Sequence, residues 1–202
     1  MIRIITDSTS DLSPARQEAL GVDVIPLSVH FGEEVFRDGV DITNEEFYDR
    51  LSKVEKLPTT SQINPEVFAD LFRKYLDQGD EIVGIFISGA MSGTCQSALI
   101  ARDMVDGEDR IHIVDSRTVT FALGLLVEVA ATLRDQGLSA GELAAKLEEL
   151  AGRLRLLAVV DTLKYLKMGG RISTASAVVG ALLNINPIIT IENGLVEGIG
   201  KA

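Results

Sequence analysis

The segment Ile82-Val83-Gly84-Ile85-Phe86-Ile87 is the clearest indication of fold class in this chain. All six of its residues are apolar or glycine, whereas a strand with one face in water alternates apolar and polar side chains. Such a strand is typical of a parallel sheet that is covered on both faces. Ile111–Val114 is a second apolar strand of this type. We expect both strands to be central and parallel in one sheet, with Ser88 and Asp115 at the same edge.

Helices are predicted around these strands. One begins at Asn64-Pro65, a second runs from about Ser92 to Met104, and a third covers Phe121–Arg134. Strands that alternate with helices predict an α/β fold, in which a mostly parallel sheet lies between two helix layers. We also expect a strand over Arg3–Thr6 and a helix after Ser13-Pro14. Val22–Phe31 and Glu34–Phe36 are predicted to form a hairpin, and helices are predicted to begin at the capping boxes of Thr43 and Ser139.

The pattern changes after Arg153, where we place a domain boundary. Residues 1–153 are predicted to form the three-layer α/β/α domain, and residues 154–202 the start of a second, two-layer α/β domain. We expect a strand over Leu154–Val160 and two short helices, over Lys164–Lys167 and Ala175–Leu183. A hairpin of Ile185–Glu192 and Leu195–Ile199 is expected to turn at Asn193-Gly194. Paired strands need a covering element, so we expect either that this domain is truncated or that another chain supplies the cover.

Charge and composition exclude several classes of protein. Of 202 residues, 46% are hydrophobic and 24% charged, which are ordinary globular values. Lys and Arg number 19 against 30 Asp and Glu, so the formal net charge is −11, which disfavours nucleic acid as a partner. A single cysteine, Cys95, excludes an intramolecular disulfide. With no leader and no bilayer-spanning apolar run in the sequence, we expect a cytoplasmic protein.

Polar residues follow three of the predicted strands, at Asp7, Ser88 and Asp115. Ligands of open α/β sheets bind outside the carboxyl ends of the strands, so these residues are expected to share one crevice. Ser92-Gly93 lies where a strand passes into a helix, and free N–H groups at a helix start favour an anion. The alternative is that Ser92 only caps its helix.

A second polar cluster, Pro58-Thr59-Thr60-Ser61-Gln62, precedes the Asn64-Pro65 helix start. Three successive hydroxyls on a loop suit a carboxylate or phosphate, because each hydroxyl donates a hydrogen bond without adding charge. The alternative is an ordinary turn.

Several enzyme classes lack their motifs here. Neither G-x-G-x-x-G after the first strand nor a Walker A sequence occurs. A serine nucleophile near Ser88 needs a base, and both histidines, His30 and His112, lie in predicted strands. Asp7 and Asp11 could bind a metal ion, but two carboxylates four residues apart are common on loops. We therefore predict no catalytic residue, no cofactor and no metal site.

Five motifs in this order resemble those of the DegV family, the bacterial fatty-acid-binding proteins that serve as acyl carriers for fatty acid kinase. The resemblance runs from residue 1 to 202, and the motifs are Asp7-Ser8-Thr9-Ser10-Asp11-Leu12, Pro58-Thr59-Thr60-Ser61-Gln62, Ser88-Gly89-Ala90-Met91-Ser92-Gly93-Thr94, Val114-Asp115-Ser116 and Leu163-Lys164-Tyr165-Leu166-Lys167-Met168-Gly169-Gly170-Arg171-Ile172.

The resemblance implies a non-enzymatic, lipid-binding function. A long-chain fatty acid would lie in an apolar tunnel between two α/β domains and be presented to the ATP-binding subunit of the kinase, with transient contact to a membrane surface. Thr60 and Ser92 would bind the carboxylate, with Ser61 and Gly93 as neighbours. The remaining candidates for ligand binding are Ser88 and Arg171, of which Arg171 is the alternative anion site.

A second hypothesis comes from a different class. The fold also resembles the substrate domains of dihydroxyacetone kinases, so the chain would be a substrate-binding or catalytic subunit for a small polar substrate. Such enzymes hold substrate through a histidine, and neither His30 nor His112 lies in a ligand motif. A DNA-binding regulator is disfavoured by the net charge of −11.

Overall fold

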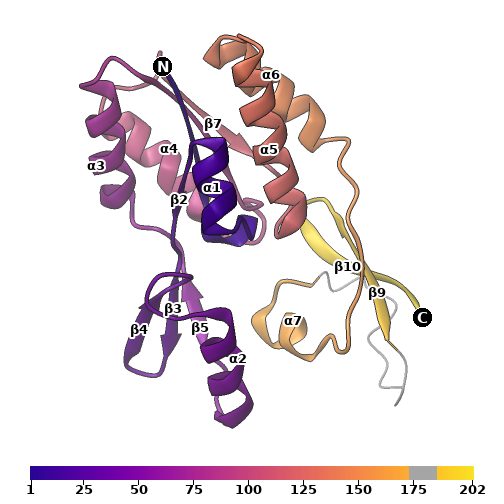
Figure 1. The fold of residues 1–202 in the computed structure, drawn as a ribbon. Helices are drawn as coiled ribbons and strands as arrows, with labels where there is room; N and C mark the ends of the chain where they lie inside the picture. The colour runs from indigo at the N-terminus through magenta and orange to yellow at the C-terminus, as the bar shows by residue number, and fades with distance from the viewer. Residues whose placement is uncertain (173–185) are drawn as a thin grey trace.

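A computed structural model of the chain describes residues 1–172 and 186–202. Its largest sheet has four parallel strands in the order β2-β1-β6-β7 (Figure 1). These strands are β1 (Ile2–Asp7), β2 (Val22–Ile25), β6 (Glu81–Phe86) and β7 (Ile111–Asp115). Every residue of β6 from Ile82 to Phe86 is buried, which confirms the parallel sheet predicted from this run.

The expectation that β7 is also central is wrong. In the described part of the chain, β7 is an edge strand that pairs with β6. Ile111 and Val114 are buried whereas His112 and Ile113 are half-buried. Helices α4 (Thr94–Met104) and α6 (Ala140–Ala151) both contact β7. Helices therefore cover both faces of β7, while its outer edge has no paired strand among the described residues. An apolar run indicates that both faces of a strand are buried, but it does not show whether both edges are paired.

Helices cover both faces of the parallel sheet, as predicted (Figure 1). On one face, α3 (Pro65–Leu76) and α4 enclose a core with Ile5, Ile82 and Phe86. On the other, α5 (Phe121–Asp135) and α6 enclose a core with Ile4 and Ile85, and α1 (Pro14–Leu20) contacts β2. Because successive strand side chains point to opposite faces, one apolar strand supplies both cores. The predicted caps are confirmed at Ser13, Thr43, Asn64 and Ser139.

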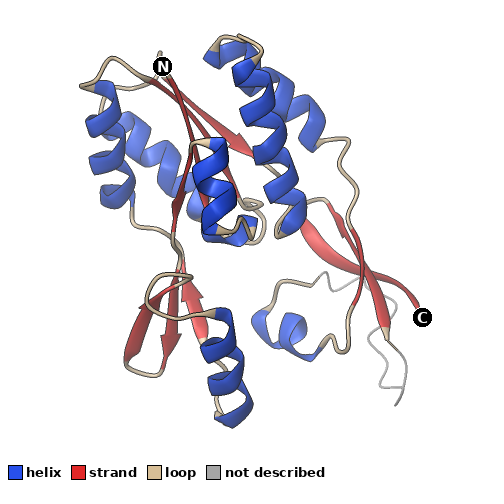
Figure 2. Ribbon diagram, in the orientation of Figure 1, coloured by secondary structure: helices blue, strands red, loops and turns tan. Residues whose placement is uncertain are grey.

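A small antiparallel sheet, in the order β4-β3-β5, stands below the parallel sheet in Figure 2. Its strands are β3 (Ser28–Phe31), β4 (Glu34–Arg37) and β5 (Thr59–Ser61), and α2 (Asn44–Lys53) lies beside them. The hairpin of β3 and β4 is confirmed, but Val22–Phe31 is not one strand. It breaks at Pro26, between β2 and β3, because proline has no N–H to donate to a ladder.

Residues 59–61 were expected in a loop, and this expectation is also wrong. They form β5, which pairs with β3 so that Thr60 is opposite Val29. A three-residue strand of exposed hydroxyl residues has no buried face, so alternation of apolar and polar residues cannot reveal it. The pairing comes from β3, whose Val29 is buried.

The C-terminal part contains α7 (Lys164–Gly169) and a three-stranded antiparallel sheet in the order β10-β9-β8. Its strands are β8 (Leu157–Val159), β9 (Pro187–Glu192) and β10 (Leu195–Lys201). The hairpin turn is confirmed, since Asn193 and Gly194 both have positive φ, 50° and 78°. The expected strand at Leu154–Val160 is shorter than predicted, and the helix expected at Ala175–Leu183 lies outside the described residues.

Candidate functional site

Polar side chains at the carboxyl edge of the parallel sheet tie together the loops that follow its strands. The Asp7 carboxylate accepts a hydrogen bond from the Ile87 N–H at 2.8 Å. The Asp115 carboxylate accepts from the Gly89 N–H at 3.2 Å. Ser88 lies between these two contacts in sequence. The prediction that Ser88 and Asp115 lie at the same edge is therefore confirmed.

A cavity of about 950 Å³ opens beside this edge. Three parts of the chain supply most of its lining: β5 with its flanking residues, the turn from Gly89 to Gly93, and α7 with Arg171. Apolar side chains make up much of its wall, and they are Leu27, Leu57, Ile87, Met91, Val119, Leu166, Met168 and Val196. The cavity thus combines an apolar wall with the two hydroxyl-rich motifs, since Thr60, Ser61, Ser92 and Gly93 all line it.

Ser92 lies immediately before the helix start. Helix α4 begins at Thr94, with Gly93 at the N-cap. The Ser92 hydroxyl oxygen accepts from the Thr94 N–H at 3.3 Å and lies 2.9 Å from Thr94 Oγ1. The N-cap of α4 makes no side-chain hydrogen bond, so Ser92 is not the cap residue of this helix, and the half-buried Ser92 lines the cavity. The amide groups of the first turn of α4 favour an anion at this point.

Ser61 has a partner that its sequence neighbours do not indicate. Its Oγ lies 3.0 Å from Nε2 of His30, which belongs to the adjacent strand β3. The two residues are 31 positions apart, so only strand pairing joins them. His30 therefore contacts a residue of a ligand motif, although it is not among the described residues that line this cavity.

Gln62 joins the two hydroxyl-rich motifs. Its Nε2 donates to Oγ of Ser97 on α4 at 2.9 Å. A Cβ atom at Gly93 would lie 1.8 Å from Gln62 Oε1, so the carboxamide rests directly against the Gly93 backbone. The side chain of Gln62 thereby connects β5 to the start of α4. Sequence reasoning assigned no role to Gln62 and gave Gly93 only as a neighbour of the ligand.

Ser88 and Arg171 occupy different positions relative to the cavity. Ser88 is buried, and its hydroxyl donates to the Gly194 carbonyl at 2.7 Å. It is not among the described residues that line the cavity, and it links the carboxyl edge of the large sheet to the β9–β10 turn. Arg171 does line the cavity, and its Nε donates to the Met91 carbonyl at 3.3 Å.

Burial shifts the pKa values of two ionisable groups near the cavity, Asp7 and Cys95. Burial raises the pKa of Asp7, although hydrogen bonds from Ile87 and Thr9 oppose the shift. Burial, with smaller effects from Asp115 and Asp7, raises the pKa of the Cys95 thiol to about 12. A thiol of that pKa is a poor nucleophile at neutral pH. Among residues 1–172 and 186–202, no group of three His, Cys, Asp or Glu residues is arranged to hold a metal ion.

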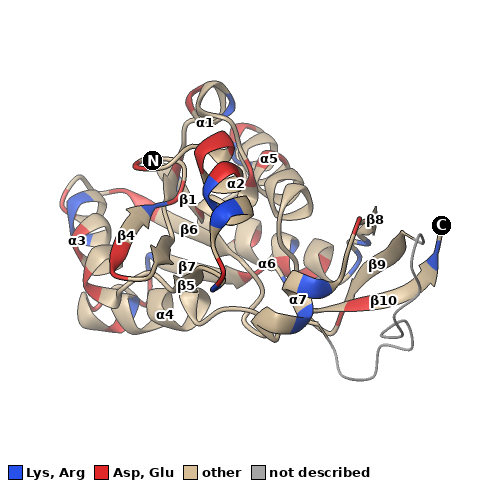
Figure 3. Cartoon of the chain, turned by 90° about the horizontal axis from the view of Figure 1, so that it is seen from below, with Lys and Arg blue, Asp and Glu red and all other residues tan. Residues whose placement is uncertain are grey.

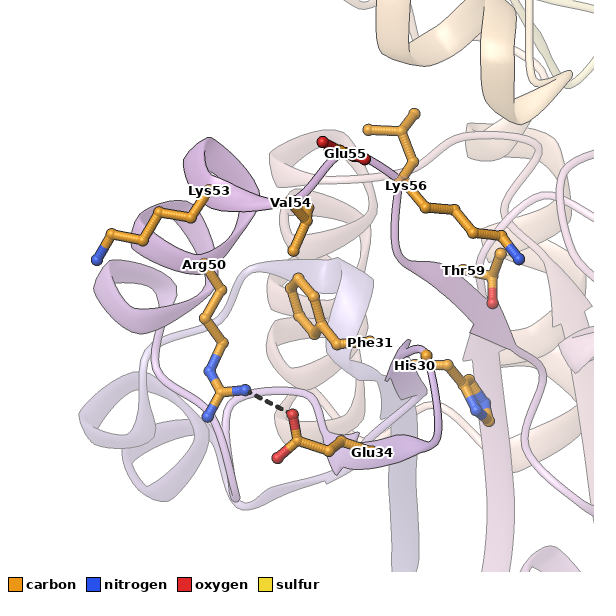
Figure 4. A pocket seen from close by; sticks show the side chains of 11 residues that line it. His30, Phe31, Glu34, Arg50, Lys53, Val54, Glu55, Lys56 and Thr59 are labelled. Carbon is orange, nitrogen blue, oxygen red and sulfur yellow. Dashed lines mark hydrogen bonds and ion pairs between the residues drawn. The ribbon is translucent and has the colours of Figure 1, made fainter.

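A second cavity, of about 480 Å³, lies between the β3–β4 hairpin and the end of α2 (Figure 4). Val54 and Phe31 point toward one another in its wall. Arg50 pairs with Glu34 at 3.1 Å and lies over the Phe36 ring, so its charge is already neutralised. The two cavities share Leu57 and Thr59. Of the two cavities, the larger one contains Thr60 and Ser92.

Comparison with known proteins identifies the family. The family model described as "Uncharacterised protein, DegV family" matches residues 1–202. The chain belongs to the DegV family. A DegV domain-containing protein of Caldanaerobacter subterraneus is 40% identical over 200 residues, which are 99% of this chain and 71% of that protein. One from Deinococcus radiodurans is also 40% identical over 200 residues, covering 99% of this chain and 70% of its own length.

Solved structures of DegV-family proteins share the fold. One, entitled "Fatty Acid Binding of a DegV family Protein from Thermus thermophilus", is 39% identical with a TM-score of 0.90. A stearic acid-binding protein from Eubacterium ventriosum is 37% identical with a TM-score of 0.91. Each comparison covers 100% of this chain and 71% of the other. The α/β fold and the family predicted from the motifs are thus confirmed. In the described residues, no helix has the length and apolar character needed to cross a membrane.

Proposed function

We propose that this DegV-family protein binds a long-chain fatty acid in the larger cavity and presents its carboxylate to the ATP-binding subunit of a fatty acid kinase. The hydroxyls of Thr60 and Ser92 hold the carboxylate, with Ser61 and Gly93 beside them. One observation carries the proposal: both hydroxyl motifs line one apolar cavity, in a fold shared with relatives that are named for binding fatty acids.

The lining suits an amphiphilic acid. Burying an acyl chain gains roughly 0.8 kcal/mol per methylene, so the apolar wall supplies the affinity. Burying an unpaired carboxylate is costly, and two hydroxyl donors with the amide groups at the start of α4 offset that cost. Arg171, at the cavity wall, is the alternative partner for the anion.

The proposed role is that of a carrier without chemistry of its own. Neither hydroxyl has to be activated as a nucleophile, and no metal or cofactor is required to hold the ligand. The kinase subunit supplies ATP and transfers the phosphoryl group to the carboxylate. Because that reaction consumes cytoplasmic ATP, we place the carrier in the cytoplasm.

Loading of the carrier requires transient contact with a membrane surface, where free fatty acids partition. Helix α7 suits such contact. Its Tyr165 and Met168 are 45% and 60% exposed, and both line the cavity. Lys164 and Lys167 lie on the same helix (Figure 3), and lysines are attracted to anionic lipid headgroups.

Native mass spectrometry of the purified protein tests the ligand class. We expect the mass of a long-chain fatty acid to be retained with the protein. Retention of a small polar substrate in its place would support the dihydroxyacetone-kinase-like alternative. With the ATP-binding subunit and ATP added, the loaded protein is expected to yield an acyl phosphate, and its absence would refute the kinase partnership.

Substitution of the two hydroxyl residues tests the site. Thr60→Val keeps the side-chain shape and removes the donor, and Ser92→Ala removes the other. A hydrogen bond to a charged group contributes about 1.5–3 kcal/mol, so each variant is expected to bind dodecanoate about ten- to a hundredfold more weakly in calorimetric titration. Thr132→Val is the matched control, since Thr132 is exposed on α5 and bonds within its own helix. Unchanged affinity in both site variants would move the anion site to Arg171.

A further inference from the structure

The side chain of Gln62 occupies the space that a larger residue at position 93 would need. An ideal Cβ at Gly93 would lie 1.8 Å from Gln62 Oε1 and 2.7 Å from its Cδ. The backbone of Gly93 has φ −75° and ψ 5°, which lies outside the left-handed region that favours glycine. A side chain at position 93 would therefore meet the Gln62 carboxamide and not a strained backbone. The occupant of that space is Gln62.

The other end of the contact is anchored in the protein core. The Gln62 carboxamide donates to Oγ of Ser97 at 2.9 Å. Ser97 lies in the first turn of α4 and is fully buried, so its hydroxyl has a fixed position. Gln62 thus meets α4 at two points, the N-cap glycine and the first turn.

Strand β5 has little else to hold it against α4. Its three residues are exposed, and its ladder partner β3 belongs to the small sheet and not to the parallel sheet. Ile63, which is buried beside α3, holds the chain just after Gln62. Of residues 62 and 63, which directly follow β5, Gln62 is the one that lies against the Gly93 backbone.

We propose that Gln62 is a positioning residue, which holds Thr60 at the distance from Ser92 at which both hydroxyls meet one carboxylate. This inference rests on the proposed function. Two donors share one anion only when their separation is held within a few tenths of an ångström, and an exposed edge strand does not hold such a distance by itself. Gln62 supplies the missing link through the Gly93 backbone and Ser97.

Calorimetric titration with dodecanoate and 1-dodecanol separates positioning from general packing. The two ligands share the acyl chain and differ in the charged headgroup. Gln62→Ala is expected to weaken dodecanoate binding about tenfold and to change 1-dodecanol binding by less than about twofold. Ser97→Ala is expected to have the same effect, although Ser97 is buried and is not among the described residues that line the cavity. Gln136→Ala, at an exposed glutamine after α5, is the control and should change neither affinity.

The combination with Thr60→Val decides whether Gln62 acts through Thr60. If it does, the Gln62→Ala/Thr60→Val double variant binds dodecanoate no more than about twofold more weakly than Thr60→Val alone. Additive losses, equal losses for acid and alcohol, or wild-type affinity in Ser97→Ala would each overturn the inference. Unchanged binding in Thr60→Val and Ser92→Ala would instead refute the proposed carboxylate site, whatever Gln62 does.

Discussion

Gly93→Ala places a methyl group where the Gln62 carboxamide lies, and its effect on stability is calculable. At 1.8 Å from Oε1 the methyl cannot coexist with the carboxamide, so Gln62 must leave. That movement breaks the hydrogen bond to Ser97 and leaves a buried hydroxyl without that partner, at about 1–3 kcal/mol. Alanine is also a poorer N-cap residue than glycine, by about 0.5–1 kcal/mol. We expect Gly93→Ala to lower the free energy of unfolding by about 1.5–4 kcal/mol.

The same substitution should be milder where the carboxamide is already absent. In the Gln62→Ala background, Gly93→Ala is expected to lower the free energy of unfolding only by the capping difference, about 0.5–1 kcal/mol. The assay is urea unfolding of the wild type, both single variants and the double variant, followed by circular dichroism. The coupling free energy between the two positions should be about 1–3 kcal/mol, which is the contribution of the lost Ser97 hydrogen bond. A coupling near zero would show that Gln62 does not occupy the space beside Gly93.

Three further predictions concern buried groups near the site. Burial raises the pKa of the Asp7 carboxyl, so the folded state keeps the carboxyl proton to a higher pH than the unfolded state does. The stability that Asp7 contributes therefore declines as pH rises above about 4 through the folded pKa. Urea unfolding across pH should show this decline in the wild type but not in Asp7→Asn, and parallel profiles would contradict the prediction. Gly194 has a positive φ of 78°, and a Cβ added there would lie 2.5 Å from Ser88 Oγ. Gly32 also has a positive φ, of 64°, but a Cβ added there would meet no atom within 4 Å. The thermal midpoint of Gly194→Ala should therefore fall further than that of Gly32→Ala, with equal shifts as the refuting result. Cys95, whose pKa is about 12, should react with iodoacetamide at about pH 8 only after denaturation, and rapid labelling of the folded protein would contradict this.

The elements with a local cause were predicted from the sequence. The β6 run, the caps at Ser13, Thr43 and Ser139 and the turn at Asn193-Gly194 all depend on residues within a few positions of one another. The incorrect predictions concern pairing partners. Val22–Phe31 contains two strands that join different sheets, and Thr59–Ser61 is a strand only because β3 lies beside it.

The candidate site divides in the same way. Local sequence accounts for the hydroxyl groups at Thr60 and Ser92 and for the start of α4 beside Ser92, because strand ends and helix starts are local features. Tertiary packing brings Gln62 to Ser97 from 35 positions away, His30 to Ser61, and Ser88 to the Gly194 carbonyl. Each of these contacts joins elements that are far apart in the chain and are brought together by strand pairing or by packing. Local preferences specify which groups are available, whereas their distances depend on how the helices and strands pack.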